Sequence, residues 1–114
     1  MTIDAKLRSL LLGLTRATAS GKFSWDKKGE SDAYEVRLPH GRISIERGTD
    51  SEENAYFDVV VKDPVDRIIE TIMIDTGDDL ELANELYLHA RRKALNLDFV
   101  LDQIIGDVNA IAVP

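Results

Sequence analysis

Apolar residues near the start of the chain recur at helical spacing. They step along the sequence by alternating four and three residues, which marks one stripe of an α-helix. The residues of the stripe are Ile3, Leu7, Leu10, Leu14 and Ala17. Gly21 suits the left-handed residue that ends a helix. The pattern therefore predicts a helix from about Thr2 to Ser20.

The middle of the chain changes to a period of two, which is typical of half-buried strands. Short alternating runs cover residues 23–26, 34–38 and 42–46. Pro39-His40-Gly41 has the composition of a turn. A tight turn at His40-Gly41 would pair Leu38 with Ile43 and Val36 with Ile45, so that all four face one side.

A second hairpin is expected from Ala55–Lys62 and Arg67–Ile74, joined by a turn at 63–66 in which Pro64 takes the second position. Pairing Lys62 with Arg67 gives one face with a single polar misfit, Glu70. The apolar residues of this face are Phe57, Val59, Val61, Ile68, Ile72 and Ile74. The other face is diluted by Asp58 and Thr71 but is also apolar, with Tyr56, Val60, Ile69 and Met73.

Helical spacing returns after the acidic loop 75–79. One stripe runs from about Leu80 to Leu95 through Ala83, Leu86, Tyr87, Ala90 and Ala94. A short last helix is expected from Phe99 to Gly106, with 107–114 as a tail. The predicted fold is a single α+β domain over residues 1–114: an N-terminal helix, an antiparallel meander of about five strands, and two C-terminal helices packed on one sheet face.

Two stretches resemble a known family. Gly21-Lys22-Phe23-Ser24-Trp25 and the run Glu85–Leu95, which contains Leu86-Tyr87-Leu88-His89-Ala90-Arg91-Arg92, are similar to the pattern of a family of small uncharacterised bacterial proteins. That pattern also has a leucine-rich first helix and a β-meander. The resemblance implies an α+β fold and transfers no activity and no functional residue.

The net charge of the chain limits the classes of partner that it is expected to bind. The chain of 114 residues has a net charge of −7, and because residues 1–57 hold equal numbers of acids and bases, the whole excess falls in 58–114. Nucleic acids and anionic membranes need clustered Lys and Arg, so neither is an expected partner. The acidity serves either solubility or a basic partner. No signal peptide is recognised, there is no cysteine, and a cytoplasmic location is expected.

Candidate metal and catalytic groups are few. Glu81, Glu85 and His89 have the spacing of one helix face, which suits metal ligands, but a solvated face is the favoured interpretation. The loop 75–79 has its glycine too early for a calcium loop. His40, in a predicted turn, has no evident partner for general-base catalysis. We therefore expect no metal, no cofactor and no enzymatic activity.

Two further sets of residues have structural interpretations. Phe23 and Trp25 are better explained as a buried pair than as a stacking platform. Arg37, Arg42 and Arg47 are expected on the outer face of the first hairpin, where Glu35 and Glu46 neutralise them.

The most informative feature is the two-sided second hairpin. If the helices cover one sheet face, Tyr56, Val60, Ile69 and Met73 are left on the other, where monomeric proteins rarely leave large apolar patches. Either a helix of the same chain crosses over or the sheet curls, or these residues form an interface. The interface interpretation predicts a homodimer, or another protein partner.

The function expected is a non-enzymatic binding or adaptor module, acting as a homodimer and chaperone-like or inhibitor-like toward a basic partner. The alternative is a small-ligand-binding or enzymatic domain with a pocket between the sheet and the C-terminal helices. Its polar groups would be Tyr34, Tyr87, His89 and Arg91.

Overall fold

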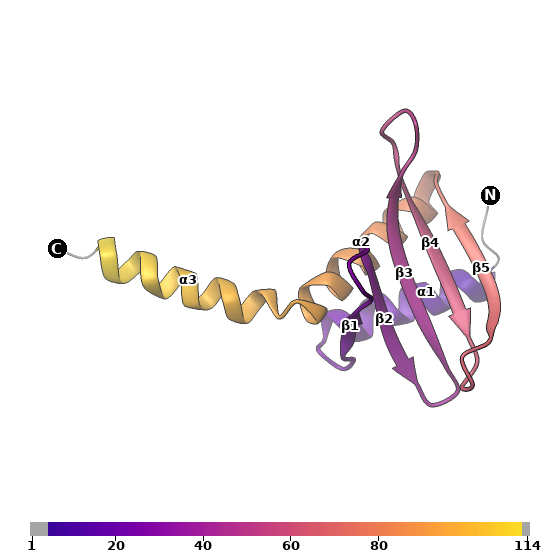
Figure 1. Cartoon of the computed structure of the whole chain (residues 1–114), viewed down its shortest axis with the longest axis horizontal. Helices are drawn as coiled ribbons and strands as arrows, with labels where there is room; N and C mark the ends of the chain where they lie inside the picture. The colour runs from indigo at the N-terminus through magenta and orange to yellow at the C-terminus, as the bar shows by residue number, and fades with distance from the viewer. Residues whose placement is uncertain (1–4, 113–114) are drawn as a thin grey trace.

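The computed structural model describes residues 5–112 and joins one helix, a five-stranded antiparallel sheet and two further helices in chain order (Figure 1). The strands lie in the sheet in their sequence order, as a meander. The predicted α+β class is therefore confirmed. The elements are α1 (Ala5–Ala19), β1 (Trp25–Lys27), β2 (Ala33–Leu38), β3 (Gly41–Thr49), β4 (Ala55–Lys62), β5 (Ile68–Ile74), α2 (Gly77–Ala94) and α3 (Leu97–Ala112).

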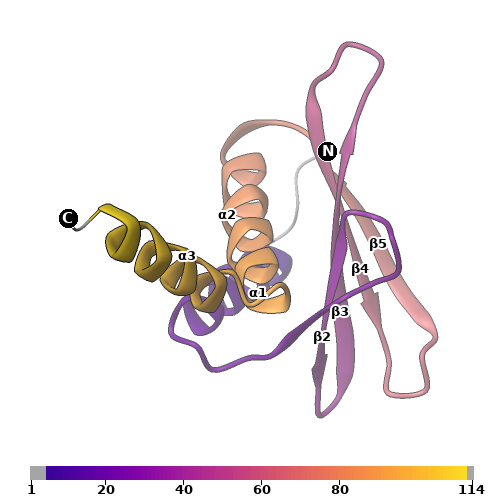
Figure 2. The same cartoon turned by 60° about the vertical axis from the view of Figure 1, so that its left-hand side comes forward.

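The helices all lie on one side of the sheet, which we call the front face (Figure 2). Helix α2 contacts all five strands, and α1 packs against α2. Near the start of both helices, the Arg8 guanidinium binds Asp79 Oδ1 at 2.9 Å, and at their ends Gly21 lies beside Lys93. The two helices are therefore parallel. The start expected at Thr2 lies outside the described residues, and Gly21, with φ of 77°, ends α1 as predicted.

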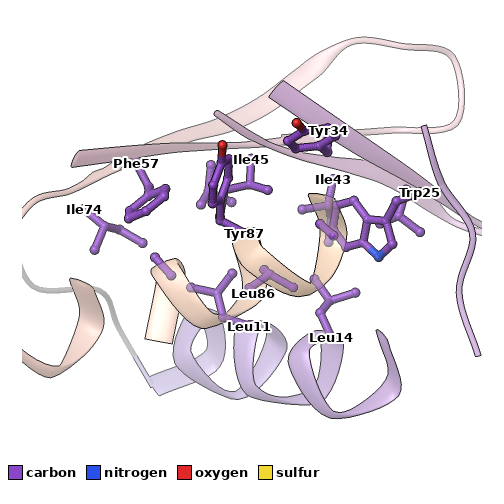
Figure 3. Packing of buried hydrophobic residues seen from close by; sticks show 14 of the residues in the cluster. Leu11, Leu14, Trp25, Tyr34, Ile43, Ile45, Phe57, Ile74, Leu86 and Tyr87 are labelled. Carbon is purple, nitrogen blue, oxygen red and sulfur yellow. The ribbon is translucent and has the colours of Figure 1, made fainter. Parts of the chain in front are cut away.

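The core lies between the front face and α2, with α1 beneath (Figure 3). Ile45, Ile74 and Leu86 have no exposed surface. Trp25 is 3% exposed, and its indole N–H donates to Thr18 Oγ1 at 3.0 Å, which joins β1 to α1. The expected α2 stripe is confirmed, because Ala83, Leu86, Tyr87 and Ala90 are all buried.

The register of the first hairpin differs from the prediction by two residues. Val36 pairs with Ile43, and Leu38 pairs with Gly41, so the turn residues are Pro39 and His40. A side chain at position 41 would collide with the Lys62 carbonyl oxygen, so glycine fits where β3 starts beside the end of β4. The shift is even, and the predicted front face is kept.

The second hairpin contains a β-bulge, which overturns part of the predicted face assignment. Lys62 pairs with Ile68 instead of Arg67, and Val61 then pairs with Glu70, so Ile69 is the extra residue. Consequently Ile68 lies with Val60 and Lys62 along the back of the sheet, and Ile69 lies with Val61 along the front. The prediction had these two isoleucines the other way round, because a bulge changes the alternation without an evident sequence signal.

The last helix is longer than predicted and does not pack on the sheet. It continues through Gly106 to Ala112, and its only packed neighbour among the described elements is α2. It leaves the body beyond β1 (Figure 1). The radius of gyration is 16.2 Å, against about 13 Å for a compact chain of this length. The expectation that both C-terminal helices cover the sheet holds for α2 alone.

Candidate functional site

One face of α3 is apolar along its whole length. From Leu97 the apolar positions step by four, three, four and three residues, the spacing of a helix–helix seam. None of the residues of α3 is buried. We call this face the α3 stripe: Leu97, Val100, Leu101, Ile104, Ile105, Val108 and Ile111.

The α3 stripe is large for a surface exposed to water. Leu97 is half-buried, and the exposed fractions of the other six residues run from 41% at Val100 to 85% at Ile111. This corresponds to on the order of 600 Å² of apolar surface, at the upper limit for monomeric proteins. A surface of this size and continuity is typical of a protein interface.

The α3 sequence is also poorly suited to an isolated helix. Helices of this length are marginal in water without tertiary packing. Valine and isoleucine lower the helix propensity, and an internal Gly106 costs about 1 kcal/mol relative to alanine. A contact on the α3 stripe would therefore stabilise the helix itself.

A groove runs between α1 and the part of the front face where β2 ends and β3 begins. It consists of two adjoining hollows of about 480 and 340 Å³ that share Leu10 and Leu38. We call it the α1 groove. Its apolar lining residues are Leu10, Leu14, Ala17, Phe23, Leu38, Pro39, Ile43, Val61 and Ile69. Its polar and charged lining residues are Lys6, Ser9, His40, Arg42 and Lys62, with Gly13 and Gly41 between them.

The back of the sheet carries three of the four residues predicted as an interface. Tyr56 and Val60 are half-buried and Met73 is 45% exposed, whereas Ile69 lies on the front face and lines the α1 groove. None of the described helices covers the back (Figure 2). The rear is open, as expected, and Ile68, which is 64% exposed, takes the place of Ile69 on it.

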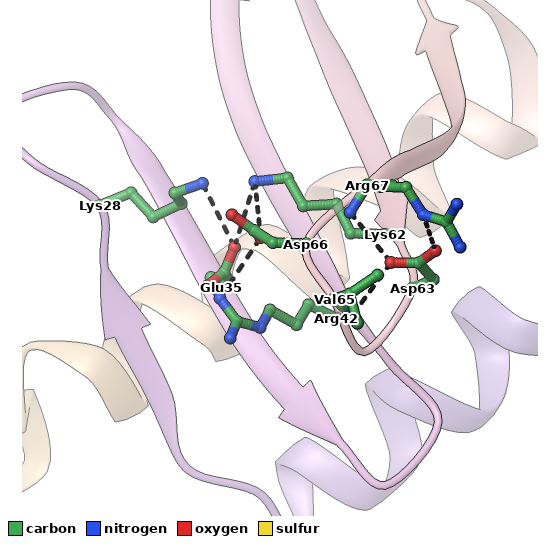
Figure 4. Close-up of polar contacts among 8 residues, drawn as sticks. All are labelled: Lys28, Glu35, Arg42, Lys62, Asp63, Val65, Asp66 and Arg67. Atoms are coloured by element: carbon green, nitrogen blue, oxygen red, sulfur yellow. Dashed lines mark hydrogen bonds and ion pairs between the residues drawn. The ribbon is translucent and has the colours of Figure 1, made fainter.

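The same face holds an ion cluster around Glu35, which is 8% exposed (Figure 4). Lys28 Nζ lies 3.2 Å and Lys62 Nζ 3.9 Å from Glu35 Oε2, and Arg42 lies 4.0 Å from the other oxygen. Asp66 Oδ1 pairs with Arg42 at 3.3 Å. The cluster makes much of the back polar, beside a hollow of about 570 Å³.

The two tyrosines of the alternative ligand-binding interpretation are hydrogen-bonded to one shared carboxylate. The Tyr87 hydroxyl donates to Asp32 Oδ1 at 2.5 Å, and that of Tyr34 donates to the same oxygen at 3.4 Å. Burial raises the pKa of both phenols, and the Asp32 carboxylate raises them further, against a small opposing effect of Arg91. The arrangement joins α2 to the loop before β2 and has a structural role.

Replacing Tyr87 by phenylalanine is expected to lower the free energy of unfolding at neutral pH by about 1–2 kcal/mol, because a charged acceptor loses its donor. The raised pKa of Tyr87 gives stability that is complete below about pH 10, where an unfolded tyrosine ionises, and is lost as the pH rises beyond it. Y87F should therefore also reduce the alkaline loss. Urea unfolding at neutral and alkaline pH measures both effects.

Tyr56→Phe, on the open back of the sheet, is the matched control and should change the neutral-pH stability by less than about 0.5 kcal/mol. Equal losses in the two variants would contradict the assigned role of Tyr87.

The other predicted candidates are dispersed. Glu81 and Glu85 are exposed and His89 is half-buried on α2, and nowhere in residues 5–112 do three His, Cys, Asp or Glu side chains gather as a metal site. His40 is exposed at the β2–β3 turn, where it lines the α1 groove. Asp79 binds Arg8.

The arginines of the first hairpin do not share one face. Arg37 pairs with Arg42 across the strands, but Arg47 pairs with Phe57, a core residue, and so lies on the front side. That part of the prediction is wrong, because odd-numbered residues of β3 face the helices.

Sequence reasoning missed the α3 stripe and the α1 groove. A signal for the stripe existed, since Val108 and Ile111 continue the spacing of Leu101 and Ile104 beyond Gly106. Taking Gly106 as a helix end concealed it. The groove has no comparable signal, because it depends on where α1 crosses the sheet.

No protein-family model, curated protein or solved structure matches this chain significantly.

Proposed function

We propose that this protein is a non-enzymatic binding module that works as a homodimer, with α3 as its docking element. The observation that carries the proposal is the α3 stripe, which no other part of residues 5–112 covers. The surface has the spacing of a helix–helix seam, and a twofold dimer is the commonest arrangement that covers such a surface in both chains.

The polar face of α3 favours a protein partner over a lipid surface. Helices that lie on membranes carry Lys and Arg opposite the apolar face. α3 instead carries Asp98, Asp102 and Asp107 and has no basic residue. None of the described helices combines the length and apolar content needed to cross a bilayer.

The acidic excess of residues 58–114 supports a basic protein as the further partner of the dimer. Such a dimer would act as an adaptor, chaperone or inhibitor. The long-range attraction would raise the association rate at low salt and fade as salt screens it.

Sedimentation velocity on the full chain tests the homodimer. We expect a species of twice the 12.7 kDa chain mass at micromolar concentration. Met73→Glu, on the back of the sheet, should leave the dimer intact if α3 is the docking element. A monomer at all accessible concentrations would overturn the proposal, and a dimer that Met73→Glu dissociates would assign the interface to the back of the sheet.

A further inference from the structure

We infer that α3 of one copy docks in the α1 groove of the second copy, and that the exchange is reciprocal. The inference rests on the proposed function and adds to it the surface to which the docking helix binds. It joins two features that the described part of a single chain leaves unpartnered: the α3 stripe and the hollows beside α1.

The first support is a row of small residues along α1. Ser9, Gly13 and Ala17 recur at four-residue spacing, and all three line the α1 groove. Small side chains at this spacing let a second helix approach closely.

Gly13 is the clearest member of this row. It lies in the interior of α1, where glycine is unfavourable for a helix, and a Cβ atom there would meet nothing within 4 Å beyond the adjoining residues and backbone of α1 itself. The fold of one chain gives no reason for glycine at this position. A helix packed into the groove gives one.

The second support is the area available. Pairing two α3 stripes with each other would bury on the order of 1,200 Å² in total, the lower limit for a stable interface. Reciprocal docking buries two stripes and two grooves, on the order of 2,000 Å² or more, which is in the range of permanent dimers. It also covers Ile69, which is 63% exposed in the groove.

The third support is charge. Helix α1 carries no acidic residue, and besides Arg8, which pairs with Asp79 of α2, it carries Lys6 and Arg16, whereas α3 carries three aspartates and no basic residue. Among the described residues, no acidic side chain lines the groove, although the chain as a whole is strongly acidic. Packing α3 beside α1 therefore places opposite charges together, and pairing two α3 helices would bring like charges together.

The junction between α2 and α3 directs α3 away from its own groove. Asn96 has a positive φ of 52°, and Arg92 Nη2 binds Asp98 Oδ1 at 2.7 Å across the bend. The helix then extends beyond the β1 edge (Figure 1). A helix that points in this direction does not reach the α1 groove of its own chain. The groove that it fills therefore belongs to a second copy.

Blocking the groove without disturbing the fold tests the inference. Gly13→Leu fills the row of small residues, and since a Cβ at this position lies in open space and leucine is a better helix former than glycine, we expect unchanged or higher helix stability with association weakened at least tenfold. Gly106→Ala is the matched control, because it changes a glycine on the opposite side of α3 from the stripe, again in open space. It should not weaken association.

Cysteine cross-linking identifies directly the surface to which α3 binds. The chain has no cysteine, so single substitutions supply the only thiols. Chains with Ile104→Cys and chains with Ser9→Cys are mixed and oxidised at micromolar concentration, and the disulfide-linked peptides are identified by mass spectrometry. We expect a mixed Ile104→Cys–Ser9→Cys dimer, and none when Asn109→Cys, on the polar side of α3, replaces Ile104→Cys.

The outcomes separate this inference from the proposed function. A disulfide between two Ile104→Cys chains, without the mixed product, would overturn groove docking and leave α3 as the docking element. A disulfide within one chain of the Ser9→Cys/Ile104→Cys double variant, with the wild type monomeric, would overturn both. Association that strengthens with added salt would also contradict the charge argument, because docking of α3 beside α1 predicts weakening.

Discussion

Replacing Ile104 by aspartate is expected to convert the proposed homodimer to monomers. Ile104 lies at the centre of the α3 stripe and is 49% exposed in the single chain. A carboxylate there would be buried on association without a partner, and central interface positions dominate binding energy. We expect association at least about 100-fold weaker, which corresponds to about 3 kcal/mol.

The matched control for Ile104→Asp is Gln103→Asp. It adds the same charge at the neighbouring position, off the α3 stripe, and should change the dissociation constant by less than about fivefold. Sedimentation velocity over a concentration series measures both variants, and circular dichroism reports whether each retains its helices. Equal weakening by the two variants would mean that added charge, and not the stripe, controls association.

The second large effect is expected in the core, where Leu86→Ala should destabilise the fold by about 2–5 kcal/mol. Leu86 has no exposed surface and packs between the sheet and α1 (Figure 3). The shorter side chain leaves a cavity and loses contacts with the sheet and with α1. Since 1 kcal/mol shifts the melting temperature of a domain of this size by about 4–8 °C, a fall of more than about 10 °C is expected.

Leu88→Ala is the control for Leu86→Ala, because it makes the same change two residues along α2, where the side chain is 49% exposed. Its cost should stay below about 1 kcal/mol. Melting temperatures must be compared at one protein concentration, since the proposed dimerisation would make them concentration-dependent. A cost at Leu88 equal to that at Leu86 would contradict the assigned face of α2.

The α+β class, the order of elements and most of the front face could be predicted from periodicity alone. The α2 stripe through Ala83, Leu86 and Tyr87 was correct because a strongly periodic helix needs no tertiary information. The residues of β2 and β3 that face the core were also correct, although their register was not. An even shift in register preserves the faces, so the alternation cannot detect it.

Two features of the candidate site were not predicted, the bulge at Ile69 and the length of α3. The bulge at Ile69 moves one side chain from the back of the sheet to the α1 groove, and it depends on how the Asp63 turn closes. Gly21 and Gly106 have the same residue type, yet one ends a helix and the other lies within one. The downstream residues distinguish the two glycines, because polar and aromatic residues alternate after Gly21, whereas the helical apolar spacing continues after Gly106.

The similarity to small bacterial α+β proteins, carried by the Gly21–Trp25 and Glu85–Leu95 stretches, stays a prediction. Both stretches supply core residues, such as Trp25 and Tyr87, which explains why they would be shared by proteins of one fold without a shared site.

Hydrogen–deuterium exchange of the α3 amides tests the central claim most directly, because it asks whether another chain covers this helix in solution. We predict that amides around Ile104 and Val108 are protected at micromolar concentration and lose protection on dilution, together with those of α1. Exchange of α3 at the rate of a free helical peptide at every concentration would contradict the account.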